Sequence, residues 1–123
     1  MALTQVASAD RPSLCVAPSA SVTSAGGYTV VRLEGEHDIA SLFVLADALS
    51  VAIALGDADL VVDLSNVQFM GSAPMRVLIR CRNLLRAQAR DLTLRSPAPC
   101  VQRMLNLCGL SDFVARGPVE LVR

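Results

Sequence analysis

Several features that would identify a partner or a cofactor are missing from this sequence. Its 11 basic and 11 acidic residues cancel, so it lacks the positive field that binding to nucleic acid or an anionic membrane surface normally needs. Its four cysteines form no C-x-x-C pair and no paired metal-ligand spacing, which argues against zinc and thioredoxin-type chemistry. We therefore expect no metal and no cofactor, and a protein or a small molecule as the partner.

Long hydrophobic runs are also missing. The first residues, MALTQVASADRP, have no basic stretch followed by an apolar one, so they do not resemble a secretory signal. The most apolar helical segment, Leu42–Leu55, is interrupted by Asp47 and Ser50 and is shorter than the roughly 20 residues that a membrane span needs. The sequence therefore predicts no membrane span and a cytoplasmic location.

What is present is enough for one folded domain. The chain has 123 residues, of which 53% are hydrophobic and 18% are charged, so it can bury a core large enough to offset the entropy of folding. Residues 1–27 are rich in Ala, Ser, Thr and Pro, which is typical of a loosely ordered arm. This arm could contain one edge strand near Leu14–Val22.

After the turn signal at Gly26 and Gly27, strands are expected to alternate with helices. The expected strands are Tyr28–Leu33, Leu60–Leu64, Asp91–Arg95 and a last strand that Gly117 and Pro118 split into Phe113–Ala115 and Val119–Val122. The expected helices are Ile39–Leu55, Met75–Arg90 and a third that Pro97 and Pro99 open and Gly109 ends. Helices between strands require crossover connections, whereas the opening hairpin is antiparallel. The sequence therefore predicts an α/β fold with a mixed sheet of four to five strands and three main helices.

The segment Gly35-Glu36-His37-Asp38 is expected to break the first long strand and to start the first helix. Asp38 can cap this helix by accepting a backbone N–H bond, and Gly56 can end it. His37 is the only histidine, and no partner for it is identifiable, so we expect an exposed loop residue and not a general base.

The second helix is expected to be amphipathic. Its apolar positions are Val77, Leu78, Cys81, Leu84 and Leu85, and its basic positions are Arg76, Arg80, Arg86 and Arg90. The basic face could bind an acidic partner or could simply be solvated. The core stripe expected for the third helix is Val101, Met104, Leu105 and Cys108.

Two cysteines are thus expected to face the core from neighbouring helices. There Cys81 and Cys108 would act as small apolar residues. The alternative is a redox switch, in which a disulfide between them locks or distorts the partner surface.

One stretch resembles the signature of STAS domains. The residues V-V-D-L-S-N-V-Q-F-M-G-S-A-P-M-R-V-L, at 61–78, are similar to the D-L-S strand and D-S-[ST]-G-L turn of that family. Three further segments agree in order and spacing: R-L-E-G-E-H-D at 32–38, L-T-L-R-S-P at 92–97 and M-L-N-L-C-G-L at 104–110. The resemblance implies a STAS domain over residues 28–123.

The resemblance also implies a function. The family's anti-sigma-factor antagonists are not enzymes; they bind a serine-kinase-like, ATP-binding anti-sigma factor and so release a sigma factor for transcription. Phosphorylation of a serine at the start of the second helix ends that binding, and by resemblance this serine is Ser72. The implied partner-binding residues are Asp38, Gly71, Ser72, Met75 and Arg76.

The turn departs from the family pattern at three positions, and alternatives stay open. Gly71 stands where the family usually has Asp, Ala73 where it has a second hydroxyl residue, and Pro74 where it has Gly. Ser72 could instead only cap its helix through the Met75 N–H, and Asp38 could only cap the first helix. A faint likeness of G-S-A-P to a nucleophile elbow lacks the second Gly and a placed His. The alternative function is a STAS subunit of a lipid or anion transport assembly.

Overall fold

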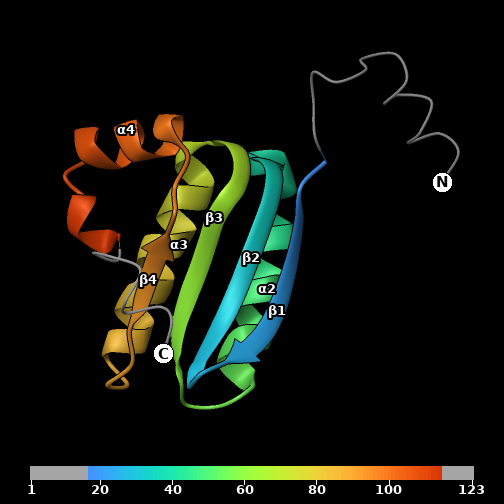
Figure 1. The fold of residues 1–123 in the computed structure, drawn as a ribbon, viewed down its shortest axis with the longest axis vertical. Coiled ribbons are helices and arrows are strands. Elements are labelled where there is room, and N and C mark those ends of the chain that lie inside the picture. The colour runs from blue at the N-terminus through green and yellow to red at the C-terminus, as the bar shows by residue number, and fades with distance from the viewer. Residues whose placement is uncertain (1–16, 115–123) are drawn as a thin grey trace, which may run out of the picture.

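A mixed four-stranded sheet forms the centre of the molecule in this computed structural model, which describes residues 17–114. The strands β1 (Ser19–Ala25), β2 (Tyr28–His37), β3 (Asp59–Met70) and β4 (Leu92–Arg95) lie in that order. β1 is antiparallel to β2, whereas β2, β3 and β4 are parallel (Figure 1). The predicted α/β fold with a mixed sheet and three main helices is confirmed.

Helices form the crossover connections that parallel strands require: α2 joins β2 to β3, and α3 joins β3 to β4. The helical elements are η1 (Ile39–Ser41), α2 (Leu42–Ala54), α3 (Ser72–Arg86), α4 (Pro99–Leu107) and η2 (Ser111–Phe113). α2 and α3 lie side by side behind the sheet, and α4 lies at the β4 edge (Figure 1). The sheet thus has one face covered by two helices.

The hydrophobic core lies between the sheet and these two helices. Alternate residues of β2 and β3 point into it, which matches the period of two that a strand dictates. Val31, Leu33, Leu60, Val62 and Leu64 pack there against Leu45 and Leu49 of α2 and Leu78 and Leu85 of α3. Phe113 of η2 is also fully buried.

The strands around the site are longer than the sequence indicated. β2 does not break at Gly35; it continues to His37, because Gly35 takes a left-handed φ of 86° and the register with β3 shifts there. β3 likewise runs six residues past Leu64, to Met70. β1 begins at Ser19 and pairs with β2 along its whole length, and Leu14 lies outside the described residues.

The chain after α4 differs from the strand that was predicted. Phe113 belongs to a 3-10 helix, and Val114 forms only an isolated bridge to Leu94, so the prediction of a strand at Phe113 is wrong. The predicted strand Val119–Val122 lies outside the described residues. α4 ends where Gly109 takes a φ of 71°, as predicted for a C-terminal stop.

Candidate protein-binding site

The carboxyl ends of β2 and β3 bring the predicted site residues together. His37 pairs with Met70 at the last register position, and the Gly71 N–H donates to the His37 carbonyl at 2.9 Å. A Cβ added to Gly71 would lie 3.9 Å from the Asp38 Cα. Asp38 and the Gly71-Ser72 turn, which are far apart in sequence, are therefore neighbours at one end of the sheet.

Asp38 caps the helical segment that follows it, as expected. Its Oδ1 accepts bonds from the backbone N–H groups of Ala40 at 3.0 Å and Ser41 at 3.2 Å. The Asp38 N–H donates in return to Ser41 Oγ at 3.0 Å. Because this capping box fixes the Asp38 carboxylate in an exposed position, the residue can also face a partner.

Ser72 is the first residue of α3, and its side chain is exposed. The N-cap is Gly71, and the Met75 N–H donates to the Gly71 carbonyl at 3.4 Å. The alternative in which Ser72 caps through the Met75 N–H is therefore wrong. Its hydroxyl forms no hydrogen bond with any other residue among 17–114.

The other predicted partner-binding residues differ in exposure. Arg76 is exposed and Gly71 is partly exposed, whereas Met75 is only 3% exposed and packs in the core. Pro74 is also buried. The surface at the start of α3 is thus formed by Ser72 and Arg76, while Met75 and Pro74 anchor the helix beneath it.

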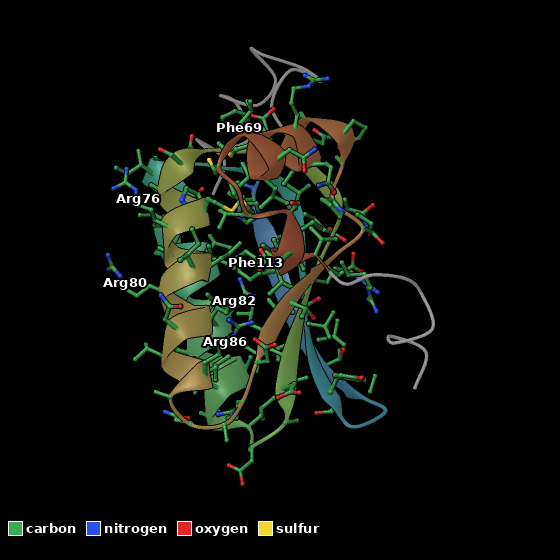
Figure 2. All side chains as sticks on the ribbon, turned by 90° about the vertical axis from the view of Figure 1, so that its left-hand side faces the viewer. Phe69, Arg76, Arg80, Arg82, Arg86 and Phe113 are labelled. Carbon is green, nitrogen blue, oxygen red and sulfur yellow. The ribbon has the colours of Figure 1, made fainter. Side chains whose placement is uncertain are left out.

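Two large apolar side chains beside these residues were missed by the sequence analysis. Ile39 is 74% exposed and directly follows Asp38, and Phe69 is 49% exposed at the end of β3 (Figure 2). Exposed apolar side chains next to polar ones are typical of the core of a protein interface. The signal in the sequence was a large apolar residue close to each polar site residue: Ile39 directly after Asp38, and Phe69 three positions before Ser72.

His37 was predicted to be an exposed loop residue, and this is wrong. Its side chain is 0% exposed, and its Nε2 lies 3.0 Å from the Glu34 carbonyl. Its buried Nδ1 accepts or donates no hydrogen bond within the distance and angle limits of one among residues 17–114. Burial lowers the pKa of His37, because it disfavours the charged ring, and the backbone carbonyl of His37 accepts the hydrogen bond from the Gly71 N–H.

The arginines of the second helix divide into two groups. Arg76 and Arg80 are exposed and point away from the molecule, whereas Arg82 and Arg86 turn toward β4 (Figure 2). Arg86 Nε lies 3.0 Å from Asp91 Oδ1, and the Arg82 guanidinium lies 4.6 Å from the centre of the Phe113 ring. The basic face therefore consists of fewer arginines than the sequence indicated.

Arg90 does not belong to that face. α3 ends at Arg86, and Arg90 is only 8% exposed. Its Nη2 and Nε donate to the Ala58 carbonyl at 3.0 and 3.2 Å, which joins the loop after α3 to the chain before β3. Leu84, predicted to face the core, is instead 58% exposed.

The two cysteines of the predicted redox pair lie in different environments. Cys81 is 6% exposed, and burial raises the pKa of its thiol. Cys108 is exposed at the C-cap of α4, so its predicted place in the core is wrong. Cys81, Cys100 and Cys108 are all free thiols.

Two kinds of feature are absent from the part of the chain that the structure describes. Residues 17–114 contain no cluster of three or more His, Cys, Asp or Glu side chains that could hold a metal ion. Over the same residues, no helix has the length and apolar character needed to cross a membrane.

Comparisons with known proteins agree with this architecture. Residues 20–121 match a family model described as "Mlab, STAS domain". The anti-sigma factor antagonist SpoIIAA in its unphosphorylated form gives a TM-score of 0.71 at 21% identity, covering 85% of this chain and 93% of that chain. The phosphorylated form of SpoIIAA, described as a Bacillus cell fate determinant, gives 0.66 at 21% identity, covering 85% and 100%.

A third structure is more similar in sequence. An anti-sigma factor antagonist from Mycobacterium paratuberculosis gives a TM-score of 0.71 at 26% identity, covering 80% of this chain and 83% of that chain. Comparison with curated protein sequences gave no significant match.

Proposed function

This chain belongs to the STAS domain family, and on that premise we propose that it acts as an anti-sigma-factor antagonist. It would bind a serine-kinase-like, ATP-binding anti-sigma factor and so free a sigma factor for transcription. Solved structures similar to it are anti-sigma factor antagonists, which supports the proposal. Because sigma factors act in the bacterial cytoplasm, the proposal places the protein there. Its role would be to regulate transcription, for example in a stress response.

The observation that carries the proposal is the position of Ser72. Its side chain is exposed at the first position of α3, directly after Gly71, which lies beside Asp38, and the side chains of Asp38 and Ile39 are exposed as well. A partner that contacts this end of the sheet would meet all three residues at once. Arg76, one turn further along α3, extends the same surface.

Phosphorylation of Ser72 would switch this surface directly. A phosphoryl group adds a charge of about −1.5 to −2 at pH 7, and the N-terminus of a helix tolerates an anion well. The phosphoryl group would also add to the negative charge at the end of the sheet where Asp38 lies, and a docking partner would have to desolvate it, so binding would be weakened. The switch would therefore change binding without unfolding the domain.

Redox switching has less support. A buried thiol with a raised pKa stays protonated and reacts slowly, which describes Cys81. Mild oxidation followed by a count of free thiols tests this alternative. If a disulfide forms between Cys81 and Cys108, both thiols disappear from the count; an unchanged count excludes the redox switch.

Capture from a cell lysate tests the proposed function. We would immobilise the wild-type protein, Ser72→Glu and the control Ser111→Glu, pass lysate of the source organism over each, and identify the retained proteins by mass spectrometry. Ser111 is an exposed serine at the start of η2, so its variant adds the same charge away from Asp38. We expect a kinase-like anti-sigma factor on the wild type and on Ser111→Glu but not on Ser72→Glu.

Two other results would contradict the proposal in different ways. Equal capture of the anti-sigma factor by Ser72→Glu would remove the phospho-switch but keep the antagonist role. Retention of a transporter ATPase or permease would instead support the other function that the sequence left open, a STAS subunit of a lipid or anion transport assembly.

A further inference from the structure

α2 has an unusual composition for a helix at the surface. Asp47 is its only charged residue between Leu42 and Ala54. A helix that is apolar on all sides is normally covered on all sides. In this structure, however, Phe43 is 72% exposed and Val51 is 47% exposed on the β1 side of α2, and Ile53 is only partly buried on the side toward α3. The apolar surface of α2 is therefore incompletely covered on both sides by residues 17–114.

The side of α2 that faces α3 forms one wall of an apolar groove of about 190 Å³. Ala46, Ser50 and Ile53 line it from α2, and Val77, Arg80 and Leu84 line it from α3. On each helix these residues follow a spacing of three or four over two turns, which gives the groove a length of roughly 10 Å. A groove of this form receives an amphipathic helix through apolar residues at i, i+3 or i+4, and i+7.

The exposed charged residues of α3 beside the groove, Arg76 and Arg80, are both basic. α3 contains no acidic residue from Ser72 to Arg86, and Arg76 and Arg80 form no ion pair with any residue among 17–114. Both side chains point away from the molecule (Figure 2). Arg82 and Arg86, by contrast, already pair with Asp91. Asp47 lines a different hollow, on the β1 side of α2.

We propose that the groove between α2 and α3 binds an amphipathic helix of a protein partner, with acidic residues along the edge that meets Arg76 and Arg80. The apolar face of the bound helix would cover Ile53, Val77 and Leu84. A second copy of this chain fits less well, because a two-fold contact at this groove would bring two copies of α3 together without an acidic residue on either. The proposal does not depend on the antagonist function. If that function holds, the groove continues the Ser72 surface down α3.

Two model helices test this proposal. Both are lactam-bridged peptides with leucine at i, i+3, i+4 and i+7; one carries glutamate along one edge, and the other carries lysine at the same positions. Binding to the full chain is measured by fluorescence anisotropy and by backbone amide NMR shifts. We expect the glutamate peptide to bind about tenfold more tightly, since two exposed ion pairs favour it, with shifts confined to residues 46–53 and 76–84.

Charge reversal makes the test specific. The double variant Arg76→Glu/Arg80→Glu should prefer the lysine peptide, whereas the control Arg103→Glu, at an exposed position of α4, should behave as wild type. Leu84→Glu should weaken binding of both peptides, and because Leu84 is exposed the variant should still fold.

Three results would overturn the proposal: equal binding of the two peptides by wild type, amide shifts outside the groove, or self-association of the free protein through residues 46–53 and 76–84. No anti-sigma factor is present in this experiment, so its failure is separable from failure of the proposed function.

Discussion

His37 shows how one buried side chain can make stability depend on pH. The unfolded chain binds a proton at this residue near the ordinary pKa of 6.5, whereas burial lowers the pKa in the native state. Between these two pKa values the unfolded state binds more protons at this residue, so the contribution of His37 to the free energy of unfolding falls as the pH falls below about 6.5 and is constant above it. The limiting slope is about 1.4 kcal/mol per pH unit.

The variant His37→Gln removes this titration. Its amide N–H can still donate to the Glu34 carbonyl, so we expect a folded protein that has lost the slope between pH 6.5 and 5. Urea unfolding at pH 7.5, 6.0 and 5.0 measures the effect. His37 is the only histidine of the chain, so the same slope in wild type and variant would show that another group causes it.

Gly71 allows a second test at a single position. Its φ of −79° is open to any residue, and a Cβ there would meet the Phe69 ring at an ordinary 3.7 Å. Gly71→Asp, which places the residue usual in the family at the N-cap of α3, should raise the free energy of unfolding by a few tenths of a kcal/mol, measured by urea unfolding. A loss of more than about 1 kcal/mol would show a clash or charge conflict with Asp38.

Three neighbouring strands are joined by one carboxylate on the face of the sheet away from α2 and α3. Asp63 of β3 lies between Arg32 of β2 and Arg95 of β4 in the register. Its Oδ2 lies 2.8 Å from Arg95 Nη2 and 3.4 Å from Arg32 Nε, and its side chain is only 7% exposed. Burial alone would raise the pKa of Asp63, but bonds from the Ser65 N–H and from Arg95 outweigh it and lower the pKa to about 2.

Asp63→Asn should therefore cost stability in a way that depends on pH. A pKa lowered from 3.8 to about 2 contributes about 2 kcal/mol above pH 4, and this contribution is lost as the pH falls through 2. Urea unfolding at pH 7 and near pH 2 should show the gap between wild type and variant closing. Asp57→Asn, at an exposed loop position before β3, is the matched control and should show no gap.

The order of elements could be predicted because it depends on patterns that lie within short segments. The period of two in β2 and the apolar run of β3 gave the strands, and Gly109 gave the end of α4. The ends of elements at the site could not be predicted in the same way. β2 passes Gly35 only because β3 offers a shifted register, which is a tertiary effect.

The placement of the candidate site residues was predictable in part. Ser72, Asp38 and Arg76 were predicted as partner-binding residues from a resemblance, and the structure places them at one end of the sheet. The burial of His37 and of Arg90 could not be found, because each depends on a carbonyl supplied by the folded backbone, at Glu34 and at Ala58. A polar side chain can be buried where it finds a hydrogen-bond partner, and the Ala58 carbonyl that binds Arg90 lies 32 positions away in the sequence.

At the scale of the whole molecule, the proposed switch residue Ser72 lies at one end of the sheet and outside the hydrophobic core. The Ser72 end lies where β2 and β3 finish and η1 and α3 begin, and the two strands beneath it are paired along nearly their full length (Figure 1). The core residues Met75 and Leu78 hold α3 to the sheet, and the exposed Ser72 is not part of this core. A change in charge at Ser72 should therefore alter the surface and leave the packing beneath it intact.

Ser72→Glu tests this separation. The added carboxylate is exposed at a helix N-terminus, so the free energy of unfolding should stay within about 0.5 kcal/mol of wild type or rise slightly. Amide NMR shifts should change only near residues 38–41 and 69–76. The contrasting variant Met75→Ala removes a buried side chain one turn away and should cost about 2–5 kcal/mol. If Ser72→Glu instead moved amides across all four strands, phosphorylation would act by loosening the fold, and the surface switch would be excluded.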